Sequence, residues 1–249
     1  MIPKIIHYCW FGRSPLPALA VKCIESWRKY LPDYEIKEWN ENNFDVNIIP
    51  YTQQAYSVKK YAFVSDYARF WILYNYGGIY FDTDVEVIEG LDDIIAKGPF
   101  MGFEQEPYRN FLGTVNPGLG LAMTPNHPFL KEMLERYKSY KFISDNGEII
   151  TKPNVVQYTT MLLKEKGLSC SQGNKQLVAG ITIYPKEFFS PICVVSNRIL
   201  ITASTRTVHR YAGSWVDGTT ISFKQKIRRL FPTRLLIWYS WFKNHRKEK

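Results

Sequence analysis

The chain has 249 residues, of which 45% are hydrophobic and 16% aromatic, and this composition predicts a globular protein of one large domain or two small ones. Its four cysteines are widely spaced with no CxxC pair, which excludes a disulfide scaffold and fits a reducing compartment. The formal net charge is +9, no stretch approaches the roughly 20 apolar residues of a spanning helix, and the first apolar run is too short for a signal peptide.

The N-terminal part of the chain alternates between strand and helix patterns. Ile2–Trp10 is predicted as a strand, and Leu16–Tyr30 as a helix with apolar side chains at steps of three or four residues. Tyr34–Trp39 alternates like a second strand, and Asn40–Pro50 is a polar loop before a second helical zone. A strand, a helix and a strand at this spacing are typical of the opening of an α/β nucleotide-binding sheet.

The stretch Tyr61–Glu89 is the one around which the function is predicted. An apolar helix carrying Asp66 and Arg69 ends at two glycines, and a short strand then leads into Asp82-Thr83-Asp84. Residues three and four apart share a helix face, so Ser65, Asp66 and Arg69 can point the same way. If the strand folds back along the helix, three carboxylates and one guanidinium meet in one pocket.

The Asp82-Thr83-Asp84 motif predicts a divalent cation site. Two neighbouring carboxylates repel each other, and a hard cation with oxygen ligands, Mn²⁺ or Mg²⁺, relieves the repulsion while sharing substrate phosphates. The alternative is a pair of solvated surface acids. Arg69 has two compatible interpretations, as the structural partner of Asp66 or as a guanidinium facing a phosphate or sugar hydroxyls. The constellation fits transfer from a nucleotide diphosphate donor.

The pattern after residue 90 predicts the remainder of an α/β sheet. Asn116-Pro117-Gly118 is expected to form a turn between two strands. The further predicted strands are Phe100–Gln105, Leu119–Thr124, Ile181–Tyr184 and Ile199–Ala203, the helices are Pro128–Tyr140 and Asn154–Lys166, and the last ordered element is Val208–Trp215.

The C-terminal tail carries nearly all of the net charge. Ser222–Lys249 holds nine basic residues and one acid, whereas the other 221 residues hold 23 basic and 22 acidic residues. Its aromatic side chains, Trp238 and Trp241 among them, lie between lysines and arginines, which favours a helix lying on an anionic membrane. A helix packed on the core and a nucleic-acid-binding segment are the alternatives. We therefore divide the chain into a catalytic domain, 1–221, and a membrane-associating tail, 222–249.

Three segments of the sequence together resemble glycosyltransferase family 32. They read IPKIIHYCWFG, CIESWRKYLPDYEIKEWNENNFDVN and YAFVSDYARFWILYNYGGIYFDTDVE, and the resemblance returns at HRYAGSW, residues 209–215. The match is to the bacterial capsular polysaccharide branch of that family. It implies a GT-A fold, with a mixed central sheet between helices, and a retaining transfer that forms an α linkage.

The resemblance also implies a role for each matching residue. Trp10 would stack on the donor base, and Ser65, Asp66 and Arg69 match the positions that contact the donor sugar. The metal ligands would be Asp82, Asp84 and His209, with Asp84 the most direct of the three, and Ser214 and Trp215 would close over the diphosphate. Without the resemblance, Trp10 and His7 are interpreted as core residues, His209 is open between ligand and structural residue, and Asn116 is assigned to its turn. Arg13 stands where a second glycine is common and is expected to contact donor phosphate or acceptor.

The sequence thus predicts a peripheral membrane α-glycosyltransferase at the cytoplasmic face of the cell membrane. It would move a sugar from a nucleotide-sugar donor, a UDP-sugar in preference to GDP-mannose, to a lipid-linked oligosaccharide during capsule or surface-polysaccharide synthesis. No nucleic-acid partner is expected. The alternatives are a non-catalytic, membrane-attached partner in a polysaccharide assembly complex and a DxD phosphatase. Glu86, two residues after the motif, argues against the phosphatase.

Overall fold

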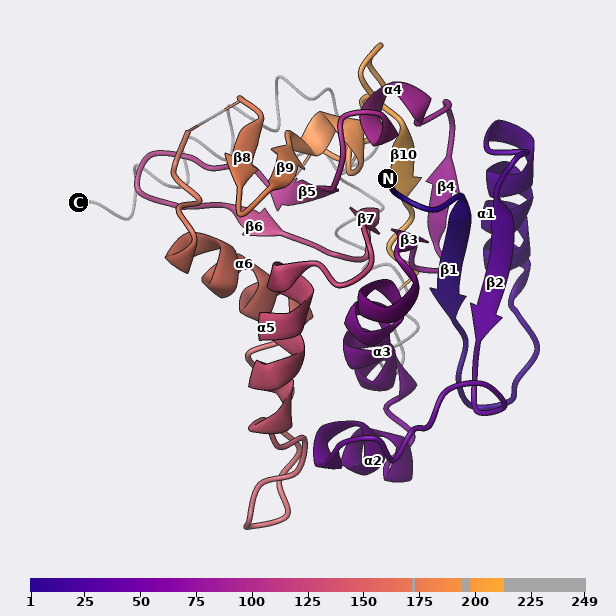
Figure 1. Cartoon of the computed structure of the whole chain (residues 1–249), viewed down its shortest axis with the longest axis vertical. Helices are drawn as coiled ribbons and strands as arrows, with labels where there is room; N and C mark the ends of the chain where they lie inside the picture. The colour runs from indigo at the N-terminus through magenta and orange to yellow at the C-terminus, as the bar shows by residue number, and fades with distance from the viewer. Residues whose placement is uncertain (172, 194–197, 213–249) are drawn as a thin grey trace.

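A mixed sheet of eight strands forms the centre of the computed structural model, which describes residues 1–171, 173–193 and 198–212. The strand order is β2-β1-β3-β7-β5-β9-β8, with β6 paired to β5, and β4 and β10 form a separate two-stranded sheet (Figure 1). The strands are β1 Ile5–Cys9, β2 Glu35–Trp39, β3 Gly78–Tyr80, β4 Val85–Val87, β5 Phe100–Gln105, β6 Thr114–Val115, β7 Leu121–Met123, β8 Gln176–Val178, β9 Ile181–Tyr184 and β10 Thr207–His209. The helices are α1 Ala18–Tyr30, α2 Pro50–Ser57, α3 Tyr61–Tyr76, α4 Asp92–Ile95, α5 Pro128–Lys138, α6 Val155–Glu165 and the 3₁₀ helix η1 Lys186–Phe188.

Strand direction decides which loops meet at the same edge of the sheet. Strand β1 is parallel to both β2 and β3, while β7 is antiparallel to both β3 and β5. It follows that β3 and β5 run in the same direction. The C-terminal ends of β1, β3 and β5 therefore meet at one edge, where ligands bind in open α/β sheets.

The period-two alternation of the strands divides the core between the two faces of the sheet. Tyr80 points into one cluster together with apolar residues of α3, α5 and α6. Ile79 and Phe81, its neighbours, point into the other cluster, which contains apolar residues of α1 and β4. Figure 1 shows α3, α5 and α6 on one side, with α1 beside the β4–β10 pair on the other. Both faces are thus covered, which explains why the central strands are apolar along their whole length.

The glycine pair after α3 produces the reversal that the sequence predicted. Gly77 has φ +63° and donates its N–H to Leu73 O at 2.9 Å, and Gly78 has φ +99°. Strand β3 starts at once and leads toward the two aspartates. The predicted mixed α/β architecture flanked by helices is confirmed.

One predicted strand is wrong. Ile199–Ala203 forms only an isolated bridge, between Ile192 and Ile199, and Leu200 donates its N–H to Pro191 O at 2.7 Å. The apolar run suggested a buried strand, but Leu200 and Ile201 are more than half exposed. The β10 strand covers the start of the predicted element Val208–Trp215, whose last three residues lie outside the described part of the chain, as does the predicted tail 222–249. Within the described ranges, no helix is long and apolar enough to cross a membrane.

Candidate functional site

Arg69 joins the helix α3 to the loop after β3. Its Nη2 lies 2.9 Å from Asp66 Oδ1, one helical turn away, and 3.2 Å from Asp82 Oδ1. Its guanidinium also stacks over the Tyr80 ring at 4.7 Å, and the Tyr80 hydroxyl donates to Asp82 Oδ1 at 3.1 Å. Arg69 is only 3% exposed. The fold-back predicted from the glycine stop therefore brings Asp66, Arg69 and Asp82 together as expected.

Burial and neighbouring charge set the protonation of this group. Burial raises the pKa of Asp66 to about 7, against the attraction of Arg69 and with the repulsion of Asp82. Burial acts to lower the pKa of Arg69, but the electrostatic interactions with Asp82 first, and then with Tyr80 and Asp66, outweigh it and raise the pKa above its ordinary value. The guanidinium therefore stays charged, with Asp82 as its strongest electrostatic partner.

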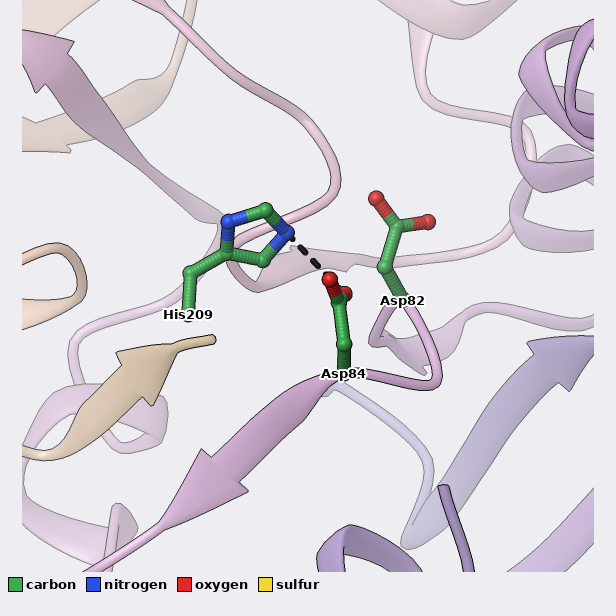
Figure 2. A group of neighbouring side chains, drawn as sticks. All are labelled: Asp82, Asp84 and His209. Atoms are coloured by element: carbon green, nitrogen blue, oxygen red, sulfur yellow. Dashed lines mark ion pairs between the residues drawn. The ribbon is translucent and has the colours of Figure 1, made fainter. Parts of the chain in front are cut away.

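Asp84 lies on the other side of the motif and faces His209. The Nε2 atom of His209 is 3.0 Å from Asp84 Oδ1 (Figure 2). The Ala212 N–H donates to Asp84 Oδ2 at 2.8 Å. The antiparallel pairing of β4 with β10 sets this contact, because Val85 pairs with His209 and Arg210 donates its N–H to Asp84 O. The predicted single pocket is thus two linked halves, one around Arg69 and one around His209.

The electrostatics of the second half follow from this pairing. Burial alone would raise the pKa of Asp84, but the hydrogen bond and charge of His209 and the Ala212 N–H hold it below the usual range. Burial would lower the pKa of His209, and the hydrogen bond and charge of Asp84 instead raise it. Each side chain thus favours the charged form of the other, with Asp84 as the carboxylate and His209 as the imidazolium.

Asp82, Asp84 and His209 fit a divalent metal ion. One ligand atom from each lies within 4.8 Å of the others, and Figure 2 shows both carboxylates and the imidazole turned toward a common space. His209 Nδ1 is buried without a hydrogen-bond partner among the described residues. Two carboxylates and an imidazole suit Mn²⁺, and the carboxylates suit Mg²⁺.

Trp10 borders this site. It follows β1, and it lines a small hollow together with Thr83, Asp84 and Ala212. It also lines a polar cavity of about 290 Å³, whose other wall residues are Arg13, Ser14, Glu38, Asn40, Glu41 and Asn42. The expectation that Arg13 contacts donor phosphate or acceptor stays a prediction. The stacking role of Trp10 remains a prediction.

The other residues singled out in the sequence have mixed outcomes. Ser65 contributes its carbonyl, which accepts from Arg69 Nε at 3.2 Å, and its hydroxyl bonds back to Tyr61 O. His7 is a fully buried core residue, as interpreted, and Asn116 does build its turn by accepting the Gly118 N–H at 2.7 Å. Ser214 and Trp215 lie outside the described residues.

Sequence reasoning missed the support around these residues. Tyr211 packs edge-on against His209, with ring centroids 4.1 Å apart. Gly118 leaves room for the motif, because a Cβ there would lie 1.9 Å from Asp82 Oδ2 and 3.0 Å from Arg69 Nη1. The Asn-Pro-Gly turn was visible as a signal, but its contact with the aspartates depends on strand order.

Comparison with known families agrees with this geometry. Residues 17–101 match the family described as "Glycosyltransferase sugar-binding region containing DXD motif", and this range contains Asp66, Arg69, Asp82 and Asp84. In this region the resemblance to a DXD-containing glycosyltransferase of the family 32 type is confirmed. Its assignment to the bacterial capsular branch stays a prediction.

Individual proteins that are similar in sequence are named as sugar transferases. The chain is 27% identical over 150 residues to inositol phosphoceramide mannosyltransferase 1 of Schizosaccharomyces pombe, covering 56% of this chain and 44% of that protein. It is 28% identical over 173 residues to glycosyltransferase L373 of Acanthamoeba polyphaga mimivirus, covering 64% of this chain and 66% of the relative. Among solved structures, PaToxG glycosyltransferase is similar with a TM-score of 0.48 and 20% identity, covering 67% of this chain and 70% of that one. The fold assignment rests on the strand order of the sheet described above.

Proposed function

We propose that the protein is a metal-dependent glycosyltransferase that moves a sugar from a nucleotide diphosphate sugar with retention, forming an α linkage. The observation that carries this proposal is the convergence of Asp82, Asp84 and His209 within 4.8 Å, with Arg69 bound to Asp82. Retention and the α linkage are supported by the resemblance to family 32. A UDP-sugar is favoured over GDP-mannose as the donor.

The residues of the chain divide the work of such a transfer. Asp82, Asp84 and His209 would hold Mn²⁺ or Mg²⁺, and the ion, when bound, neutralises charge that develops on the leaving diphosphate. Arg69 keeps Asp82 in place, and its Nη1, which has no hydrogen-bond partner among the described residues, would bind the donor. The buried position of this atom excludes competing water, so a hydrogen bond to a phosphate or sugar oxygen there is strong.

The proposed acceptor is a lipid-linked oligosaccharide, in capsule or related surface-polysaccharide synthesis. The fission yeast relative is named for inositol phosphoceramide, which supports an acceptor on a phosphate-bearing lipid. The basic, aromatic tail Ser222–Lys249 would hold the enzyme on the cytoplasmic face of the membrane, near that acceptor.

A donor panel tests the catalytic proposal. UDP-glucose, UDP-galactose, UDP-N-acetylglucosamine and GDP-mannose are each added with and without Mn²⁺, and the shift in melting temperature is measured. We expect one donor to stabilise the protein only with the metal, since a ligand that binds the native state shifts its unfolding by mass action. If no donor binds with Mn²⁺, the catalytic proposal fails and a non-catalytic partner protein is favoured. Release of inorganic phosphate from a phosphomonoester without sugar transfer would support a phosphatase.

The location is tested separately with anionic liposomes. Deleting Ser222–Lys249 should release the protein from phosphatidylserine vesicles in a sedimentation assay, while donor hydrolysis by the deleted form stays within about twofold of the full chain. Equal sedimentation of the two forms would contradict the role of the tail without touching the catalytic proposal.

A further inference from the structure

A carboxylate outside the DxD motif reaches the same edge of the sheet. Strands β3 and β5 run in the same direction because both are antiparallel to β7. Asp82 follows β3, and Glu104 lies one residue before the end of β5. Elements at the C-terminal ends of like-directed strands converge in space, so Glu104 faces the region that the metal ligands occupy.

The turn after β6 fixes the Glu104 side chain relative to Asp82. Asn116 is 7% exposed, and its Nδ2 donates to Glu104 Oε1 at 3.2 Å. Its Oδ1 accepts the Gly118 N–H at 2.7 Å, and Gly118 O accepts the Asp82 N–H at 3.0 Å. One chain of hydrogen bonds therefore runs from Glu104 to the backbone of the metal-binding loop.

Glu104 is also close to the other half of the site. Tyr211, which packs on the His209 ring, bonds to Ser190 Oγ over 2.8 Å. The Glu104 carboxylate is in turn a side-chain hydrogen-bond partner of the Tyr211 phenol. The carboxylate therefore lies between Asn116 and Tyr211, on the rim of the metal site.

The Glu104 carboxylate keeps acceptor capacity, because it offers about four lone-pair sites and its bonds with Asn116 and Tyr211 occupy only part of them. Glu104 is half-buried, and it forms no ion pair with the residues that the structure describes. Arg69 Nη1 is buried at the same turn without a partner in that part of the chain, 3.0 Å from where a Gly118 Cβ would stand. A buried donor without a partner is unfavourable, and an oxygen of a bound ligand would satisfy it. A carboxylate acceptor and a guanidinium donor on one rim are suited to hydroxyl groups.

We propose that Glu104, oriented by Asn116, binds a sugar hydroxyl at the reacting end of the site. This inference rests on the proposed function and adds a substrate-binding residue to it. The hydroxyl belongs either to the glycosyl group of the donor or to the acceptor that attacks it. In both cases the carboxylate accepts the hydrogen bond of the hydroxyl, and no covalent bond to Glu104 is formed.

The test compares Glu104→Gln with Glu148→Gln, a control in an exposed loop. Glutamine keeps the shape and can still accept from Asn116, so the melting temperature should stay unchanged. The probes are UDP, GDP, UDP-glucose and GDP-mannose with Mn²⁺, and the readouts are binding affinity and hydrolysis with water as the acceptor. Loss of a hydrogen bond to a charged group predicts an effect of about tenfold or more.

The outcomes separate the two sources of the hydroxyl. If Glu104 binds the donor, Glu104→Gln weakens binding of the nucleotide sugar about tenfold and leaves the nucleotide diphosphate unchanged. If it binds the attacking hydroxyl, whose place water takes in the hydrolysis assay, nucleotide-sugar affinity stays the same and the hydrolysis kcat falls about tenfold or more. Glu104→Asp should recover part of either loss. Unchanged affinity and unchanged kcat in Glu104→Gln would overturn the inference, whereas a wild-type protein that binds no nucleotide sugar would overturn the proposed function itself.

Discussion

Arg210 Nε donates a hydrogen bond to Glu86 Oε2 at 2.7 Å, and Nη2 of the same guanidinium also contacts that oxygen. Arg210 follows His209, and Glu86 lies two residues after Asp84. The pair therefore fastens β10 to β4 directly beside the contact between the two proposed metal ligands. Lys22 lies 3.5 Å from the other Glu86 oxygen, so Glu86 is held on both sides.

We expect Arg210→Gln to weaken Mn²⁺ binding about three- to tenfold, because a partly buried charged hydrogen bond contributes on the order of 1 kcal/mol to the placement of His209. Titration calorimetry or the electron paramagnetic resonance of free Mn²⁺ measures this. The exchanged pair Glu86→Arg with Arg210→Glu should recover part of the affinity.

The matched control for this prediction is Asp93→Asn. Asp93 pairs with Arg206, just before β10, through an ion pair of 3.0 Å at the end of the strand remote from His209. The Asp93→Asn variant should be slightly less stable than the wild type and should bind Mn²⁺ with unchanged affinity. Equal losses of metal affinity in Arg210→Gln and Asp93→Asn would show that both act only by loosening the segment.

Asp84→Ala is predicted to remove metal binding and sugar transfer while the fold persists. Asp84 supplies a carboxylate to the proposed ion, and its removal leaves His209 without the partner that raises its pKa. We expect Mn²⁺ affinity to fall by more than about a hundredfold, with far-ultraviolet circular dichroism unchanged. Asp33→Asn, on an exposed carboxylate, is the control. Wild-type turnover in Asp84→Ala would contradict the metal assignment.

Local sequence signals predicted the part of the site that is local in the chain. The i, i+3 spacing placed Asp66 against Arg69, and the glycine pair brought the following strand back along the helix to Asp82. These contacts depend on helix periodicity, turn chemistry and strand length, all of which can be read within thirty residues or so.

The rest of the site depends on strand order, which local patterns do not encode. The glycine turn alone groups Asp84 with Arg69, whereas β10 arrives from the far end of the chain and brings His209 to Asp84, a pairing that only the family resemblance implied. Glu104 reaches the same edge only because β7 separates β3 from β5. The error at Ile199–Ala203 has a similar cause, since an apolar, β-branched run forms a strand only where a neighbouring strand is available to pair with it.

Gly118→Ala should disrupt the site through sterics alone. The added Cβ would lie 1.9 Å from Asp82 Oδ2, so Asp82 has to move away from Arg69 and the proposed metal. Overpacking of this kind costs about 1–3 kcal/mol of stability, and we expect Mn²⁺ affinity to fall about tenfold or more. Gly90→Ala is the control, because the nearest atom to its Cβ would be 3.9 Å away. Equal Mn²⁺ affinity in the two variants would mean that the position of Asp82 does not matter for the ion.

His7 predicts how stability depends on pH. Its ring is fully buried, Nε2 lies 2.9 Å from Gly77 O, and Nδ1 accepts from Trp39 Nε1 at 3.0 Å. Trp39 can only donate, so Nδ1 must stay unprotonated in the folded protein. Burial, the largest cause, lowers the pKa of His7 from 6.5 to about 4.

Between about pH 6.5 and about pH 4 the unfolded chain therefore binds a proton at His7 that the folded chain does not. The free energy of unfolding should fall as the pH falls through this window, by up to about 1.4 kcal/mol per pH unit, and this contribution should level off below it. The free energy of unfolding is measured with urea at several pH values in this window, for the wild type and for His7→Gln. The difference between the two proteins isolates the effect of His7, because they share all other titrating groups. His7→Gln should be less stable at neutral pH and show the shallower slope. Parallel slopes in the two proteins would contradict the assigned neutral ring.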